Sequence, residues 1–579
     1  MSEKLTITNE RVDDIPLLLA QLEKLQVASL LDEHFPTHGH WQGLSLGQVT
    51  SVWLSFMLSQ ANHRLSHVQP WAQARLETLA TCLGEPVREL DWSDDRLALI
   101  LDQLSEDEAW TEFEQTLNQH TMRVYDLDTP RVRIDSTTAK GYLQVTEEGL
   151  FQLGHSKDHR SDLPQVKINM SVLDPLGMPL TTTVVAGNRA DDPLYVPEIK
   201  RVQQSVGRRG VTYIGDCKMA ALETRAFVAA NDDYYLCPLS NVQVNEEDWE
   251  QLLEPVHNEQ QVLSPVYRCS EATEPEQIAE GYETEVSLKA TLEDRTIEWA
   301  ERRLVVRSLK LAKRQEQALG QRVEQALIAT AKLNQRGQGK KRWSNEAELE
   351  AAVEGIVARY RVRGLIQWQI NTQISERTVR GYRDRPTRVI QERTVQVSAQ
   401  LNEAALTQTL GRLGWRVYVT NQPVESLSLE QAVWAYRAEY MVERGFGRLK
   451  GKPLSLTPMY LDSDQRVTGL IRLLMIGLRV LTLLEFRVRS TLQQQGGKLA
   501  GIYAGNPKRA TARPTTELML KAFEGLTLTL VQQTGQLQRH LTSLSQVQQR
   551  ILDLLDLSSD VYSRVCQHFS KPVLILSEP

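Results

Sequence analysis

The stretch VKINMSVLDPLGMPLTTTVVAG, residues 166–187, decides the fold class of this chain. Two runs rich in β-branched residues flank the turn sequence PLG, and this pattern predicts a β-hairpin. The run RVRIDSTT, residues 131–138, has the same character and predicts a strand before the hairpin. After the hairpin, helical and strand patterns alternate. The predicted elements are a helix at 193–206, a strand at 211–217, a helix at 219–231 and a strand at 233–239.

This order of elements predicts a mixed α/β sheet, of which the ribonuclease H type is one instance. Helical periodicity precedes it at residues 10–120 and returns at residues 428–451, and a small helical region ends the chain. Between the two parts of the core, short strand-like runs, a basic helix and an Arg-rich section indicate an inserted domain. We therefore expect five parts. They are an N-terminal helical accessory domain (1–128), the first part of the core (129–240), the insertion (241–420), the second part of the core (421–490), and a linker with a C-terminal helical region (491–579).

The net charge of −7 is unevenly distributed along the chain. Residues 1–128 contain 8 Lys and Arg against 21 Asp and Glu, whereas the remainder contains 58 against 52. Within the remainder, residues 301–343 carry 12 basic and 3 acidic side chains. A local basic surface of this kind can bind phosphate groups whatever the overall charge. The acidity of the whole chain therefore does not exclude a nucleic-acid partner.

Cysteine usage and hydropathy indicate where the protein works. The five cysteines never form a CxxC pair, which argues for a reducing compartment and against a zinc–thiolate site. The N-terminus lacks the apolar segment of a signal peptide. The apolar run 468–486 is interrupted by Arg472 and Arg479, so it predicts a buried core helix with no membrane partner. These two arginines share a helix face, and the pattern leaves open whether they form core ion pairs or contact a phosphate. We expect a cytoplasmic protein.

Three acidic positions are candidates for chemistry. Asp135 lies inside an apolar strand, where a charge is costly to bury without a partner. Asp216 ends the strand VTYIGDC, at the position from which ligands are usually met in α/β sheets. The third is Glu439 or Glu443, which lie about 40° apart on one helix face, so the face alone does not choose between them.

Converging carboxylates without Cys or His suit a hard cation such as Mg²⁺. Two such ions about 3.5 to 4 Å apart can activate an attacking oxygen and stabilise a leaving oxygen at phosphorus. From spacing alone this signal is weak, because a lone Asp at a strand end is more often a cap or an ion-pair partner.

Five segments together carry a more specific signal. They are RIDSTTAKGY, HSKDHRSDLPQVKINMSVLDPLGMPL, GNRADD, YIGDCKMAALE and VERGFGRLKGKP. In this order and spacing the chain resembles the DDE transposases of bacterial insertion sequences, in the branch with a large insertion before the catalytic Glu. The N-terminal stretch HFPTHGHWQGLSLGQVTSVWLS resembles the accessory helical domain of one group of these enzymes. The resemblance covers most of the chain and implies a ribonuclease H-like catalytic core.

The resemblance implies roles for individual residues. Asp135, Asp216 and Glu443 would be the catalytic, metal-ligating carboxylates, with two Mg²⁺ ions and Mn²⁺ as a plausible substitute. The family signature runs Tyr, two residues, Arg, three, Glu, six, Lys; Tyr436, Glu443 and Lys450 match it, but Glu439 stands at the Arg position. That departure puts the contact of the Arg in doubt. The expected DNA-binding residues are Tyr436, Arg444, Arg448 and Lys450, together with Lys157, His159 and Arg160 along the DNA path.

The function implied is a transposase that binds the terminal inverted repeats of its element, cuts phosphodiester bonds there and joins the ends to target DNA. Its partner would be double-stranded DNA, on which it would act as a homodimer in the bacterial cytoplasm, associated with the nucleoid. Two alternatives stay open: a ribonuclease H-like nuclease or resolvase without strand transfer, and a non-catalytic DNA-binding relic of an element.

Overall fold

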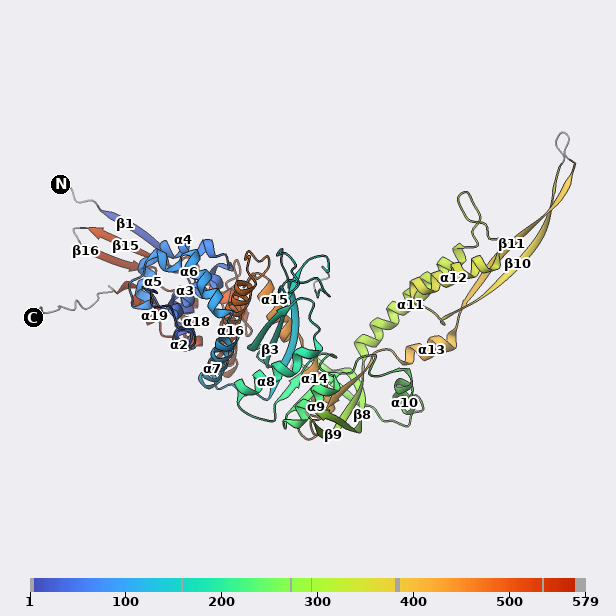
Figure 1. The fold of residues 1–579 in the computed structure, drawn as a ribbon, viewed down its shortest axis with the longest axis horizontal. Helices are drawn as coiled ribbons and strands as arrows, with labels where there is room; N and C mark the ends of the chain where they lie inside the picture. The colour runs from blue at the N-terminus through green and yellow to red at the C-terminus, as the bar shows by residue number, and fades with distance from the viewer. Residues whose placement is uncertain are drawn as a thin grey trace, which may run out of the picture. The chain divides into compact units, whose positions relative to one another are not determined.

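The chain folds into two compact units. The computed structural model describes residues 5–157, 160–270, 273–292, 294–380, 386–533 and 536–567. The first unit contains the residues up to 237, residues 289–298 and the residues from 435 onward. The second contains residues 238–288 and 299–434. Both predicted aspartates, Asp135 and Asp216, lie in the first unit. Figure 1 shows the chain coloured by residue number from the N-terminus to the C-terminus.

Five strands of the first unit are neighbours in a mixed sheet, in the order β4-β3-β2-β5-β6. Strand β3 pairs antiparallel with both β2 and β4, whereas β5 runs parallel to β2 and β6 runs parallel to β5. Every residue of β3 is buried, as expected for a strand inside a covered sheet. The predicted strand, hairpin and two later strands are all present, but β5 is shorter than the predicted strand at 211–217 and ends before Asp216. Their bounds are β2 Arg131–Lys140, β3 Gln165–Asp174, β4 Met178–Ala186, β5 Thr212–Ile214 and β6 Tyr234–Pro238.

Helices from distant parts of the sequence pack against this sheet. Helices α7, α8 and α16 contact β4, and α15 contacts β2. The short break between α14 and α15 lies at residues 438–439, next to the predicted acidic face. The bounds are α7 Asp107–Tyr125, α8 Tyr195–Val206, α9 Leu222–Ala230, α14 Leu429–Arg437, α15 Tyr440–Lys450 and α16 Asp464–Gln494.

Helix α16 is the core helix that its apolar sequence predicts. It is long and apolar enough to cross a membrane, but 94% of its most apolar window is buried inside the protein. Arg472 donates to the main-chain oxygen of Leu104 at 2.9 Å and pairs with Asp107. Arg479 donates to Asn118 Oδ1 at 2.6 Å. Both arginines therefore bind groups of the protein core.

The N-terminal region is helical, as its periodicity predicts. A capping box between Ser45 and Gln48 starts α3, whose central residues are buried. Helix α6 packs against α16, and α2 packs against α7. The bounds are α1 Ile15–Lys24, α2 Val27–His34, α3 Leu46–Gln60, α4 Val68–Gln73, α5 Leu76–Leu83 and α6 Asp94–Leu104.

The two ends of the chain differ from the purely helical regions expected there. Strand β1, Thr6–Arg11, pairs antiparallel with β15, Thr527–Gln533, which also pairs with β16, Gln536–Leu541. The alternation of apolar and polar residues in TLTLVQQ fits a half-buried strand, but its partner lies about 520 residues away and no local pattern announces it. The remaining elements are β13 Leu499–Ala500, β14 Ala510–Thr511, α17 Thr516–Lys521, α18 Gln546–Leu555 and α19 Asp560–Ser563.

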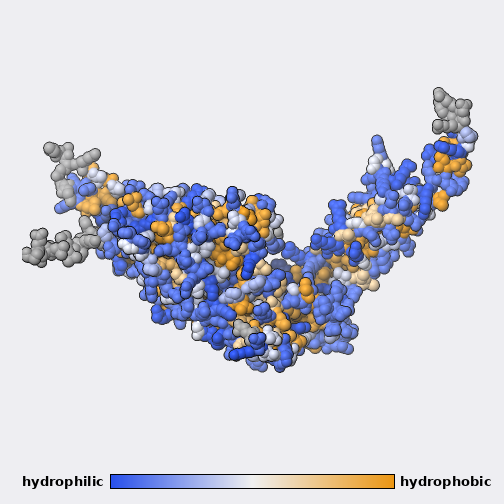
Figure 2. Space-filling view, viewed as in Figure 1, coloured by the Kyte–Doolittle hydropathy of each residue, from blue (hydrophilic) through white to orange (hydrophobic). Residues whose placement is uncertain are grey.

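The second unit combines a four-strand arrangement, β12-β9-β8-β7, with a helical part and a long ribbon. The ribbon is the antiparallel pair β10–β11, and its inner half packs with α11 and α12 around Leu319, Val353 and Val395. Figure 2 shows apolar surface at its far end, where Ile374 and Val389 are exposed. The bounds are α10 Glu246–His257, β7 Ser264–Ser270, β8 Thr273–Leu292, β9 Arg295–Ser308, α11 Leu309–Lys332, α12 Glu346–Tyr360, β10 Ile366–Val379, β11 Arg388–Leu401, α13 Glu403–Gly411 and β12 Trp415–Thr420.

Candidate active site

Asp135 and Asp216 occupy matching positions after two paired residues of neighbouring parallel strands. Strand β2 pairs with β5 so that Arg133 lies opposite Ile214. Each aspartate follows its member of this pair by two residues; Asp135 is still within β2, whereas Asp216 lies two residues beyond the end of β5. The parallel register therefore brings together two carboxylates that are 81 positions apart in the sequence.

A small cavity joins these aspartates to the helical segment that carries the predicted glutamates. Its volume is about 20 Å³, enough for roughly one water-sized particle. Gly215 is closely packed in its wall, because a Cβ there would lie 2.7 Å from Met219 Sδ and 3.0 Å from Tyr195 Cε1. The residues that line the cavity are Arg133, Ile134, Asp135, Ile214, Gly215, Asp216, Tyr436, Glu439 and Val442.

The Asp135 carboxylate is partly buried and is bound by donors. Its Oδ1 accepts hydrogen bonds from the main-chain N–H of Ser136 at 2.7 Å and from Lys157 Nζ at 3.0 Å. Burial raises the pKa of Asp135, and the charge of Asp216 raises it further, whereas Lys157 and the Ser136 N–H lower it. The net effect is a raised pKa, so a cation that approaches Asp135 would stabilise the charged form of this carboxylate.

Asp216 is held in place by a buried tyrosine. The Tyr195 hydroxyl donates to Asp216 Oδ1 at 2.7 Å, and the main-chain N–H of Lys218 donates to the same oxygen at 2.8 Å. Tyr195 is 4% exposed, and its burial together with the charge of Asp216 raises the pKa of Tyr195 well above its usual value. The tyrosine is therefore a neutral hydrogen-bond donor at neutral pH.

Glu439 and Glu443 lie on the same side of α15 but in different surroundings. Glu439 precedes the helix, lines the small cavity and is half-buried. Burial raises the pKa of Glu439, and the charges of Asp135, Glu443 and Asp216 raise it further, opposed by Arg133. Glu443 lies in the first turn of α15, is exposed and does not line the cavity. Both glutamates thus remain candidates for the third carboxylate, and Glu439 has the closer association with the aspartates.

Arg133 is a buried residue of the site that the sequence reasoning did not single out. It is 3% exposed and donates to the main-chain oxygen of Ala435, to that of Tyr436 at 3.5 Å, and to Asp174 Oδ2 at 3.0 Å. It therefore binds the carboxyl end of α14 just before Glu439. A basic residue within the apolar run RVRIDSTT was the available signal, because a buried charge needs a partner.

The other predicted DNA-binding residues differ in their exposure and in their contacts. Tyr436 lines the cavity and is 9% exposed, and Lys450 Nζ lies 3.4 Å from the main-chain oxygen of Thr138 on β2. Arg160 is exposed and pairs with Asp162 at 2.8 Å. His159 lies outside the described residues. Their contacts with DNA stay predictions.

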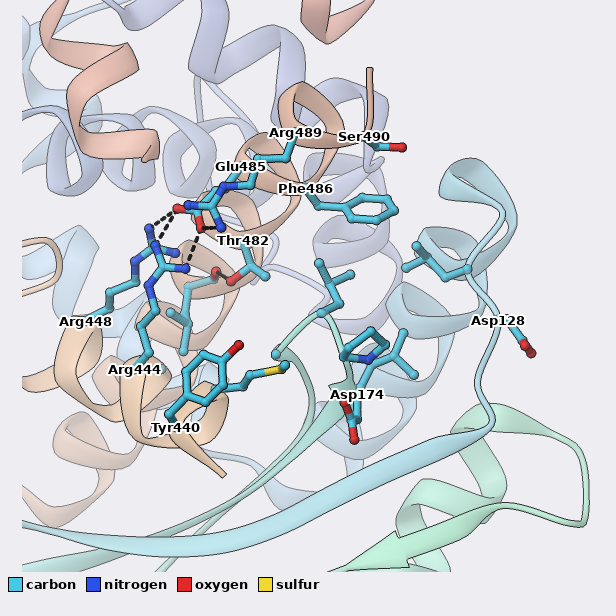
Figure 3. A pocket seen from close by; sticks show the side chains of 18 of the residues that line it. Asp128, Asp174, Tyr440, Arg444, Arg448, Thr482, Glu485, Phe486, Arg489 and Ser490 are labelled. Carbon is cyan, nitrogen blue, oxygen red and sulfur yellow. Dashed lines mark hydrogen bonds and ion pairs between the residues drawn. The ribbon is translucent and has the colours of Figure 1, made fainter. Parts of the chain in front are cut away.

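Arg444 and Arg448 lie on the opposite face of α15, beside a second cavity of about 500 Å³. Figure 3 shows their guanidinium groups converging with that of Arg489 on the carboxylate of Glu485. Arg448 is 7% exposed and also pairs with Glu517 at 2.9 Å, whereas the side chain of Arg444 is 40% exposed. Arg448 therefore holds α15 to α16, whereas Arg444 is partly exposed, and the contacts of both with DNA stay predictions.

The donors around the small cavity suit a hard divalent cation. They are carboxylate oxygens, with no thiol or imidazole among the described residues of the cavity wall. The Lys157 ammonium already supplies a positive charge to Asp135. In the described part of the chain, no three carboxylate, thiol or imidazole groups converge closely enough to hold an ion in their present rotamers. Side-chain rotation would therefore accompany metal binding by Asp135, Asp216 and a glutamate.

A solved structure with some likeness to this chain is described as the cryo-EM structure of the piggyBac transposase synaptic complex with hairpin DNA. The matched region covers 49% of this chain and 60% of the chain in that structure, with 10% sequence identity and a TM-score of 0.23. No curated protein matches the chain.

A family model described as "Transposase DDE domain" matches residues 126–478. The match includes both aspartates, the whole second unit, both glutamates and the first half of α16. It extends over more than half of the chain. The protein therefore belongs to the DDE transposase family.

Proposed function

We propose that this protein binds the terminal inverted repeats of an insertion sequence, hydrolyses phosphodiester bonds there and joins the freed 3′ ends to target DNA. The observation that carries the proposal is the parallel register of β2 and β5, which leads Asp135 and Asp216 into the wall of one cavity. The family match supports a transposase, and the arrangement of the two aspartates supports phosphoryl transfer as its reaction.

Asp135, Asp216 and Glu443 would hold two Mg²⁺ ions, for which Mn²⁺ is a plausible substitute. When bound, such ions supply activation of an attacking oxygen and stabilisation of a leaving oxygen at phosphorus. The chain's own groups position the ligands: Tyr195 orients Asp216, and the Ser136 N–H orients Asp135. The strand order of the first unit, with three antiparallel strands followed by two parallel ones, supports a ribonuclease H-like core.

Double-stranded DNA is the proposed partner, with two protein chains on each paired set of ends. Lys450 lies beside β2, where it would contact a phosphate near the cleaved bond, and Tyr436 would approach the same end of the DNA. Basic residues of the insertion would add salt-sensitive phosphate binding. The place of action would be the bacterial cytoplasm, at the nucleoid.

The test uses purified full-length protein, labelled DNA ends carrying the inverted repeats that flank the gene, a supercoiled target and Mg²⁺. Cleaved ends and joined products are expected with the wild type, and neither is expected with Asp135→Asn, Asp216→Asn or Glu443→Gln. Cleavage without joined products would favour a nuclease or resolvase. Binding without cleavage by the wild type would favour a non-catalytic relic.

A further inference from the structure

We propose that Glu439 supplies an additional carboxylate to the divalent-cation site of Asp135 and Asp216, so that the site draws on two glutamates of one helical segment. This inference rests on the proposed function, because it concerns the same cation site. The position of Glu439 on the helix does not assign it a role. A role follows from the cavity and from the contacts that hold the junction between α14 and α15.

The first observation is which residues share the cavity. Asp135, Asp216 and Glu439 all line the same space of about 20 Å³, whereas Glu443 does not. Three carboxylates around so small a volume repel one another, although in their present rotamers they do not converge closely enough to hold an ion. A divalent cation offsets this repulsion with a ligand of suitable size and chemistry.

The second observation is that a residue of β2, the strand that carries Asp135, binds the end of α14 just before Glu439. Arg133 lies two residues before Asp135 on β2 and binds the last main-chain oxygens of α14, those of Ala435 and Tyr436. The Tyr436 oxygen also accepts a hydrogen bond from the main-chain N–H of Glu439 at 3.2 Å. One buried guanidinium therefore sets the position of Glu439 relative to Asp135.

The third observation concerns what the Glu439 side chain does not do. Glu439 occupies the N-cap position of α15, yet its side chain makes no capping hydrogen bond to this described helix. The N–H groups of the first turn therefore do not hold the Glu439 carboxylate, and its residue lines the cavity.

The test measures Mn²⁺ binding to the full-length protein by calorimetry, with electron paramagnetic resonance of bound Mn²⁺ as a second readout. Glu439→Gln keeps the size of the side chain and removes its charge, and we expect it to raise the Kd for Mn²⁺ about ten-fold. Glu439→Asp keeps the charge and should bind Mn²⁺ more tightly than Glu439→Gln. The matched control is Glu350→Gln, an exposed position on α12, which should bind like the wild type. Thermal unfolding in EDTA checks that each variant folds.

The outcomes separate this inference from the proposed function. If Asp135→Asn and Asp216→Asn weaken Mn²⁺ binding but Glu439→Gln binds like the wild type, the role of Glu439 is wrong and the cation site stands. Equal affinities of Glu439→Gln and Glu439→Asp would also overturn the role of Glu439. If the aspartate variants too bind Mn²⁺ like the wild type, the cation site of the proposed function fails as well.

Discussion

Lys157 Nζ lies 3.0 Å from Asp135 Oδ1, and the same ammonium donates to the main-chain oxygen of Ser136. A side-chain cation therefore already faces the aspartate that we propose as a metal ligand. Its side chain is 35% exposed, so it can leave Asp135 without disturbing the core. The ammonium and a divalent cation would compete for one carboxylate oxygen.

Replacing this lysine should strengthen metal binding. We expect Lys157→Met to lower the Kd for Mn²⁺ by about three- to ten-fold, because the competing ammonium is gone. This change corresponds to about 1 kcal/mol in the free energy of Mn²⁺ binding. Calorimetric titration of the DNA-free protein measures the change. Arg160→Met is the matched control, because Arg160 pairs with Asp162 and not with Asp135. Unchanged or weaker Mn²⁺ binding by Lys157→Met would show that the ammonium does not compete with the cation.

Tyr195→Phe should slow cleavage without weakening DNA binding. The substitution removes the 2.7 Å hydrogen bond to Asp216 and leaves the Lys218 N–H as the donor to that oxygen among the described residues. A ligand carboxylate that is less well oriented typically loses about ten-fold in metal affinity or activity. Single-turnover cleavage over a series of Mn²⁺ concentrations should show a rate restored in part at high Mn²⁺. A rate equal to that of the wild type at every concentration would exclude a positioning role.

Arg448→Met should destabilise the protein, whereas Arg444→Met should have a smaller effect on stability. Arg448 is buried between Glu485 and Glu517, but Glu485 keeps Arg444 and Arg489 after the substitution. We therefore expect a loss of about 2 kcal/mol in the free energy of unfolding, less than for an isolated buried pair. Denaturant unfolding measures it. A stable Arg448→Met protein with weakened DNA binding would instead favour direct contact with DNA.

Asp14 predicts a pH dependence of stability. Burial raises the pKa of Asp14 to about 7 from an ordinary 3.8, although a hydrogen bond with Ser59 lowers it. Between these two pH values the folded state binds more protons than the unfolded state, so the free energy of unfolding falls as the pH rises through this window. Asp14→Asn should remove this fall and be more stable than the wild type at pH 8, by about 2 to 4 kcal/mol.

The measurement for Asp14 is urea unfolding at pH 5 and at pH 8. Its control is Glu148→Gln, which replaces an exposed carboxylate and should keep the wild-type pH dependence. If Asp14→Asn loses as much stability as the wild type between the two pH values, another group is responsible.

The basic face of α11 should contribute to the salt dependence of DNA binding. Lys310, Lys313 and Arg314 are exposed near the start of this helix. Replacing all three with Gln should weaken binding to any DNA sequence and reduce the slope of log K against log salt by about 3. Fluorescence anisotropy at several salt concentrations measures the slope. The control is the double variant Gln317→Ala and Gln321→Ala on the same helix, which should keep the wild-type slope.

Part of the site could be predicted because its signals are local. An acidic residue in an apolar strand made Asp135 a candidate, and the acidic residue after VTYIG made Asp216 another, whereas the family resemblance implied their roles. Helical periodicity placed Glu439 and Glu443 on one face, where their difference in burial could not be read. Arg133 was missed because two of its partners, main-chain oxygens about 300 positions later, leave no trace near it in the sequence.

The sequence by itself determined the strands, the hairpin, the core helix α16 and the residue types of the candidate site, because periodicity and turn composition act over neighbouring residues. Only the tertiary structure decided that Arg448 is bound to Glu485, that β1 pairs with β15, and that Glu439 shares a cavity with the two aspartates. These relationships depend on strand register and helix packing between distant segments. Register and packing are set by the burial of many side chains at once, so no single stretch of the chain specifies them.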